Sequence, residues 1–136
     1  MAKKDIGIGI IGIGMGANVL YINRQPDSRF EVRGLCSPTE GKVRRLAEQW
    51  SIPYWTTDYR ELIARPDIQV IGVYSPDSVH AEQALAALRA GKHVLCTKPM
   101  CTTVEDAAAL VQEVDRTGLK FLVGQTMRFD PEFANA

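Results

Sequence analysis

The stretch of sequence that decides the fold is Ile6–Ile11 (IGIGII), followed without a break by Gly12–Ala17 (GIGMGA). A continuous apolar run of this kind is typical of a central parallel strand that is buried on both faces. In the loop behind it, Gly12 permits a tight turn, Gly14 lets the backbone approach a pyrophosphate, and Ala17 keeps the next helix close to the sheet. The spacing therefore predicts a dinucleotide-binding loop made of Gly12, Gly14, Met15, Gly16 and Ala17.

Strands and helices alternate along the rest of the chain. Apolar and β-branched runs predict further strands over 30–36, 52–55, 70–74, 93–96 and 121–124. Between the strands, helix signals predict helices over 17–24, 37–50 with Ser37 as its N-cap, 58–64, 77–90 and 103–118. Strands separated by helices pair in parallel through right-handed crossovers. We expect an α/β fold with a doubly wound parallel sheet of about six strands.

Length and charge narrow the class of protein. A chain of 136 residues buries about 68% of its unfolded surface, enough for one domain with its own core. Sixteen basic and sixteen acidic side chains cancel, which argues against a nucleic-acid or membrane-surface partner. The apolar stretch over 6–13 is too short to span a bilayer. Three cysteines, an odd number without framework spacing, favour a reducing, cytoplasmic location, and no metal site is expected.

The residues after the second predicted strand bear on the choice of cofactor. An acidic residue about 20 positions beyond the glycine loop would bind the ribose 2′-hydroxyl of NAD. Cys36 and Ser37 stand there instead, with Lys42, Arg44 and Arg45 nearby. A hydroxyl with a cation suits a 2′-phosphate, so the sequence favours NADP over NAD. In the alternative interpretation, Ser37 only caps a helix and the basic residues form a solvated face.

Two further motifs resemble a known family. They are Ser75–His80 (SPDSVH) and Gly91–Pro99 (GKHVLCTKP). Together with the glycine loop they resemble the glucose–fructose oxidoreductase/inositol dehydrogenase (Gfo/Idh/MocA) family, over nearly the whole chain. Arg128–Pro131 (RFDP) resembles the start of that family's second domain. The resemblance implies the N-terminal NAD(P)-binding Rossmann domain of an oxidoreductase that acts on sugars, polyols or related hydroxy and carbonyl compounds.

The resemblance also implies roles for single residues. The loop with Ser75, Pro76 and His80 would line the cofactor, as would Thr97 and Pro99. Lys98 would reach the nicotinamide ribose and the substrate hydroxyl, where it would assist proton transfer as the catalytic residue.

Some residues depart from the family's pattern or have a plainer interpretation. Thr97 stands where the family commonly has glutamate, which puts one contact to the cofactor ribose in doubt, and Asp77 stands where asparagine is common. The alternative for His80 is packing on its helix, and the alternative for Lys98 is an exposed loop lysine.

The end of the chain sets the last expectations. Residues 1–126 are predicted to form the NAD(P)-binding domain, and 127–136 to begin a linker to a C-terminal domain that would supply most of the substrate pocket. The chain alone would then bind a nicotinamide dinucleotide with little turnover, and exposed Met127, Phe129 and Phe133 would favour a homo-oligomer. One alternative is a stand-alone, non-catalytic nucleotide-binding subunit, or a protein completed by a partner chain. Another is a Rossmann domain for a nucleotide-sugar or S-adenosylmethionine.

Overall fold

The computed structural model describes residues 3–134, and within them six strands form a single sheet. Neighbouring strands are parallel throughout, in the order β3-β2-β1-β4-β5-β6. The strands are β1 (Ile6–Ile11), β2 (Phe30–Cys36), β3 (Tyr54–Thr56), β4 (Val70–Val73), β5 (His93–Thr97) and β6 (Phe121–Gly124). This order, with crossovers on both sides of β1, confirms the expected doubly wound sheet.

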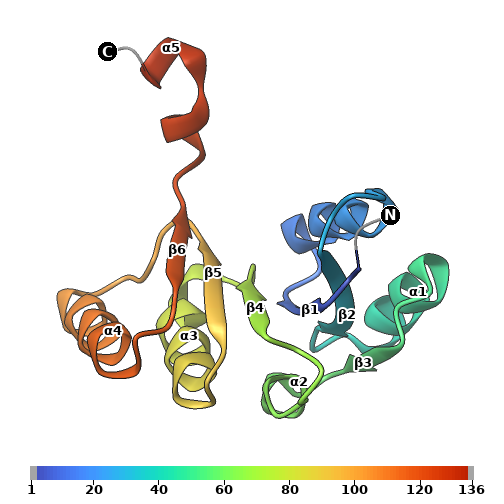
Figure 1. Ribbon diagram of the computed structural model, residues 1–136. Helices are drawn as coiled ribbons and strands as arrows, with labels where there is room; N and C mark the ends of the chain where they lie inside the picture. The colour runs from blue at the N-terminus through green and yellow to red at the C-terminus, as the bar shows by residue number, and fades with distance from the viewer. Residues whose placement is uncertain (1–2, 135–136) are drawn as a thin grey trace.

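Helices connect the strands and cover both faces of the sheet. The described residues form η1 (Met15–Arg24), α1 (Glu40–Trp50), α2 (Tyr59–Ile63), η2 (Asp77–Val79), α3 (His80–Arg89), α4 (Val104–Thr117), η3 (Thr126–Phe129) and α5 (Pro131–Ala134). Helices α3 and α4 lie against β5 and β6, whereas α1 lies beside β2 and β3 at the other end of the sheet (Figure 1). The segments η3 and α5 stand beyond the end of β6, away from the sheet (Figure 1).

Two hydrophobic cores hold these layers together, one on each face of the sheet. The first joins β1 and β2 to η1 and α1 through buried side chains that include Ile8, Ile10, Leu20, Leu35 and Val43. The second joins β4 and β5 to α2, α3 and α4 through Leu62, Ile71, Val73, Val94, Leu88 and Leu110, among others. Full burial of each such side chain contributes about 1.5–3 kcal/mol of transfer free energy. The long apolar run of β1 is therefore explained by its position between two cores.

The start of the first helix differs from the sequence prediction. The helix over 15–24 begins two residues earlier than expected and is a 3-10 helix. At its start the N–H of Ala17 donates to the carbonyl of Gly14 at 3.3 Å, an i to i+3 bond.

The region around β3 also differs. Ser37 does not cap α1, because its N–H donates to the carbonyl of Thr56 at 3.3 Å and so extends the pairing of β2 with β3. Thr39 occupies the N-cap position. Ile52 lies outside the strand, since its N–H donates to the carbonyl of Ala47 at 2.8 Å, at the end of α1.

The helix expected over 77–90 is divided into η2 and α3, so Asp77 starts a short 3-10 turn and does not cap the α-helix. Within residues 3–134, no helix has the length and apolar character that crossing a bilayer requires.

Candidate functional site

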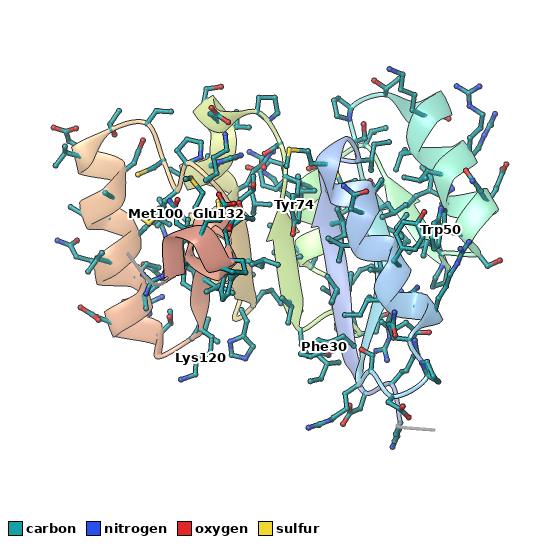
Figure 2. The ribbon with its side chains drawn as sticks, turned by 90° about the horizontal axis from the view of Figure 1, so that it is seen from above. Phe30, Trp50, Tyr74, Met100, Lys120 and Glu132 are labelled. Carbon is teal, nitrogen blue, oxygen red and sulfur yellow. The ribbon has the colours of Figure 1, made fainter. Side chains whose placement is uncertain are left out.

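A crevice opens at the carboxyl edge of the sheet, where β1 and β4 are neighbours. From β1 the chain crosses to β2 through η1, and from β4 it crosses in the other direction to β5 through α3. Tyr74, just after β4, lies between the half of the sheet that carries α4 and the half that carries Trp50 on α1 (Figure 2). Loops that leave neighbouring strands in opposite directions create a ligand-binding crevice.

A pocket of ≈ 320 Å³ occupies this crevice. It draws its lining from the ends of β1, β2, β3 and β4 and from the first turns that follow them. The lining residues are Ile11, Gly12, Cys36, Ser37, Pro38, Thr57, Tyr59, Ser75, Pro76, Val79 and Gln83. Of the predicted site residues, Gly12, Ser37, Ser75 and Pro76 therefore meet at one pocket.

Two glycines of the loop after β1 are required by the fold itself. Gly12 has φ +90°, and a Cβ there would lie 2.5 Å from the carbonyl group of Tyr74. Its N–H donates to the carbonyl of Cys36 at 2.9 Å, which ties the loop to the end of β2. A Cβ on Gly16 would lie 2.7 Å from the side chain of Ile10. Packing alone explains why these two positions carry glycine.

Gly14 is different, because packing does not explain it. A Cβ built at Gly14 meets no packed neighbour within 4 Å, although its φ of −66° and ψ of −95° lie outside the helical region that side chains prefer. Gly14 and Met15 are exposed at the start of η1, where the first N–H groups have no partner within the helix. That helix end also carries a partial positive charge. The arrangement leaves room and hydrogen-bond donors for an anionic group close to the backbone, with Ala17 partly buried behind it.

The loop after β4 is held by polar contacts. The hydroxyl of Ser75 donates to the side-chain oxygen of Gln83 on α3. His80 is fully buried, with its Nε2 2.7 Å from the carbonyl oxygen of Ser75 and its Nδ1 2.7 Å from the carbonyl oxygen of Pro99. Ser75 and Pro76 face the pocket, whereas His80 lies behind the loop and contacts its backbone. Direct contact between His80 and a cofactor stays a prediction.

The turn after β5 carries the predicted catalytic lysine. Thr97 is the last residue of β5 and pairs with Gly124 of β6. Lys98 is exposed and forms no hydrogen bond or ion pair within residues 3–134, and its peptide bond to Pro99 is cis. The Lys98 ammonium group is therefore free of protein partners in the described part of the chain. Its role in proton transfer stays a prediction.

The residues predicted to select the cofactor lie at the end of β2 and the start of α1. Ser37 is buried, and its hydroxyl accepts a hydrogen bond from the N–H of Thr39 at 3.4 Å. Arg44 pairs with Glu48 at 3.9 Å, and the guanidinium of Arg45 donates to the carbonyl of Gly41 at 3.0 Å. Lys42, in the first turn of α1, is exposed and its ammonium has no partner among the described residues.

The sequence did not point to Thr57, Tyr59 or Gln83 as pocket residues. Burial raises the pKa of Tyr59 to about 12, and a hydrogen bond to Glu82 adds to the increase, so the phenol stays protonated at neutral pH. Burial likewise raises the pKa of the Cys36 thiol to about 12, with Asp58 and Glu61 contributing. Because Thr57 and Tyr59 follow the carboxyl end of β3, the sheet topology could have indicated them.

The comparison with known proteins agrees with this geometry. The model of the Gfo/Idh/MocA family, described as an oxidoreductase family with an NAD-binding Rossmann fold, matches residues 6–125. The chain belongs to this family. The match confirms the resemblance inferred from the glycine loop and the two later motifs, and it makes the chain a nicotinamide-dinucleotide-binding domain of an oxidoreductase.

Individual relatives of this Gfo/Idh/MocA domain are sugar and polyol dehydrogenases. Levoglucosan dehydrogenase of Pseudarthrobacter phenanthrenivorans is 38% identical in an alignment 141 residues long. The alignment covers 98% of this chain and 36% of the relative. Inositol 2-dehydrogenase of Salmonella paratyphi B is 30% identical over 125 residues, 90% of this chain and 37% of the relative. A solved levoglucosan dehydrogenase in complex with NADH and levoglucosan has a TM-score of 0.85 and 29% identity, covering 95% of this chain and 36% of that one. The chain thus spans a little over a third of the length of its relatives.

Proposed function

We propose that this domain holds the cofactor for hydride transfer between a nicotinamide dinucleotide and a sugar, polyol or related hydroxy compound. Gly14 carries the proposal: packing leaves the space beside it open, and a side chain there would obstruct a bound phosphate. The oxidised cofactor supplies the hydride acceptor, and the residues of this chain bind and orient it.

The geometry favours one orientation of the dinucleotide. The pyrophosphate would lie on the backbone of Gly14, Met15 and Gly16, at the start of η1. The adenosine would lie toward Ser37 and Tyr59, because the end of β2 follows the glycine loop on that side. The nicotinamide half would then extend toward the loops after β4 and β5.

Residues after β4 and β5 would meet the nicotinamide half. Ser75 and Pro76 line the pocket on that side, and Thr97, Lys98 and Pro99 follow the adjacent strand. Lys98, which has no protein partner in the described part of the chain, would hold or move the proton of the substrate hydroxyl while hydride is transferred.

We further propose a preference for NADP. The end of β2 presents the hydroxyl of Ser37 and no carboxylate, and Lys42 offers an unpaired ammonium one turn away. A phosphate on the ribose 2′-oxygen would find a cation there, whereas the 2′-hydroxyl of NAD would lack its usual acidic partner.

Three further proposals concern the surroundings of the domain. Residues 1–126 would form the cofactor domain and 127–136 the start of a linker, which fits the position of η3 and α5 beyond the sheet (Figure 1). Exposed Met127 and Phe129 would favour self-association, whereas the side chain of Phe133 lies outside the described residues. The buried thiols of Cys36 and Cys96 suit a reducing, cytoplasmic environment.

Calorimetric titration tests the proposal directly. The chain would be titrated with NADPH, NADH and, as a ligand without nicotinamide, S-adenosylmethionine. We expect saturable binding of both dinucleotides, tighter for NADPH, and no binding of S-adenosylmethionine. Tighter binding of S-adenosylmethionine than of either dinucleotide would contradict the proposed function, and equal or tighter binding of NADH would contradict only the preference for NADP.

A further inference from the structure

The two histidines of the chain make opposite kinds of hydrogen bond. Each ring nitrogen of His80 lies 2.7 Å from a backbone carbonyl oxygen, one of Ser75 and one of Pro99. His93, at the other end of β5, uses its Nδ1 to accept a hydrogen bond from the N–H of Lys120 at 3.0 Å. His80 therefore faces two acceptors, whereas His93 faces a donor.

These contacts connect two loops through one ring. A carbonyl oxygen only accepts hydrogen bonds, so a ring nitrogen of His80 that carries a proton donates to the carbonyl it faces. The Nδ1 of His93 instead accepts from the backbone, at the opposite edge of the sheet.

The charged and titratable groups around His80 provide no alternative partner. Asp77 and Glu82 flank it in the sequence, and Glu82 bonds to Tyr59 and Arg60 on α2. On β5 and its turn, the thiol of Cys96 contacts the carbonyl of Thr97, and Lys98 is exposed. From α4, Glu113 pairs with Arg89 and Arg116. Within residues 3–134 no carboxylate forms an ion pair with the imidazole ring.

We propose that His80 acts as a positioning residue that clamps the loop after β4 to the turn after β5. The role in binding rests on the proposed function, because those two segments are the ones assigned to the nicotinamide half of the cofactor. The Ser75 carbonyl fixes the segment that lines the pocket, and the Pro99 carbonyl fixes the turn that carries Lys98.

The clamp is tested without any ligand, by amide hydrogen exchange in the unaltered chain and in the variant His80→Phe. We expect the amides of the loop after β4 and of the turn after β5 to exchange faster in the variant, while those of β1 exchange as before. Unchanged exchange in both of these loops would overturn the inference.

The positioning role is tested by comparing NADH with ADP, which lacks the nicotinamide riboside. In the variant His80→Phe, both carbonyls lose their contact with a ring nitrogen while the ring volume is nearly kept. We expect the Kd for NADH to rise about tenfold, the change that corresponds to roughly 1.4 kcal/mol, with the Kd for ADP unchanged. His80→Gln restores one donor and should recover part of the loss, and His93→Phe, at the opposite edge of the sheet, should leave both constants unchanged.

The possible outcomes separate the two claims. Equal weakening of NADH and ADP in His80→Phe would indicate a general loss of structure and overturn the positioning role. If the unaltered chain bound no NADH, the proposed function would fail and the role of His80 in binding with it, while hydrogen exchange would still decide whether His80 holds the two loops together.

Discussion

The two halves of the sheet form the crevice in different ways. In the half made of β1, β2 and β3, the loop at the site packs closely because two of its residues have no side chain. Gly12 leaves room for the backbone of Tyr74, and Gly16 leaves room for the side chain of Ile10. In the half made of β4, β5 and β6, the loops are held by polar side chains, with His80 and Gln83 bonding to Ser75. The first half is therefore fixed by backbone sterics, and the second by a hydrogen-bond network.

The largest expected effect concerns the half made of β1, β2 and β3, where a side chain at Gly12 would disturb the loop. Gly12→Ala places a Cβ 2.5 Å from the carbonyl of Tyr74 at a φ of +90°, and we expect it to lower the free energy of unfolding by about 3 kcal/mol. Gly91→Ala is the matched control, since Gly91 has φ +79° but no atom within 4 Å of its Cβ. Gly91→Ala should lower the free energy of unfolding by only about 1–2 kcal/mol. Urea unfolding measures both, and equal losses would show that the contact with Tyr74 is unimportant.

A smaller effect separates folding from binding within the same loop. Gly14→Ala adds a methyl group that meets no packed neighbour, so the free energy of unfolding should fall by only about 1 kcal/mol, the cost of a side chain at a ψ of −95°. If a phosphate approaches this backbone, the Kd for NADH should rise tenfold or more, about 1.4 kcal/mol. Gly41→Ala on α1 is also free of contacts within 4 Å and should leave binding unchanged. Calorimetry of the two variants decides, and unchanged binding in Gly14→Ala would remove the main support for the pyrophosphate site.

The contrast between the halves also explains what the sequence could reveal. Gly12 and Gly16 act through their own missing side chains, so a local pattern was enough to predict their place. The contact of Gly14 with a pyrophosphate stays a prediction. His80 acts on the carbonyls of Ser75 and Pro99, which are 5 and 19 residues away. No local pattern encodes such contacts, and the sequence placed His80 at the site without predicting that it lies behind the loop.

Errors in the predicted elements have the same origin. Ser37 followed by proline and Glu40 is a good cap signal. The backbone of Ser37 instead pairs with Thr56 on β3, which lies 19 residues away. Tertiary pairing outweighed the local preference there. The family motifs, by contrast, located both later loops correctly, because each follows a strand whose apolar run was easily recognised.

The third prediction concerns a property that both halves share. Cys36 ends β2 and Cys96 lies in β5, yet both thiols are buried in the same core. Burial raises the pKa of Cys36 to about 12 and that of Cys96 to about 11, above the value of about 8.5 for a free thiol. As the pH rises, the thiols of the unfolded chain lose their protons before those of the folded chain. The stabilisation by the neutral thiols is therefore fully present below the pKa of a free thiol, and it is lost as the pH rises toward the pKa values of the folded chain.

Unfolding in urea at about pH 8 and about pH 9.5 measures this loss. Each thiol should lower the free energy of unfolding by about 1 kcal/mol over that interval. The variants Cys36→Ala and Cys96→Ala should each lack the loss of stability that the removed thiol causes over this pH interval, although both variants are less stable overall. Tyr59 and Tyr74 also have a raised pKa, but their free value near 10 places their contribution at higher pH. A stability that is flat across the interval would contradict the assignment.

The smallest expected effect concerns α1, beside β2 and β3, where we propose that charge favours NADP. Lys42→Ala removes an exposed ammonium, and exposed charge pairs contribute about 0.2–1 kcal/mol. The Kd for NADPH should therefore rise about threefold, while that for NADH stays constant. Arg44→Ala is the matched control, because Arg44 lies on the same helix but already pairs with Glu48. Since exposed charges are screened by salt, the difference between NADPH and NADH should also shrink at high ionic strength. A parallel loss of affinity for both dinucleotides would mean that Lys42 contributes only to the general field of α1, and that the 2′-phosphate is held by other groups.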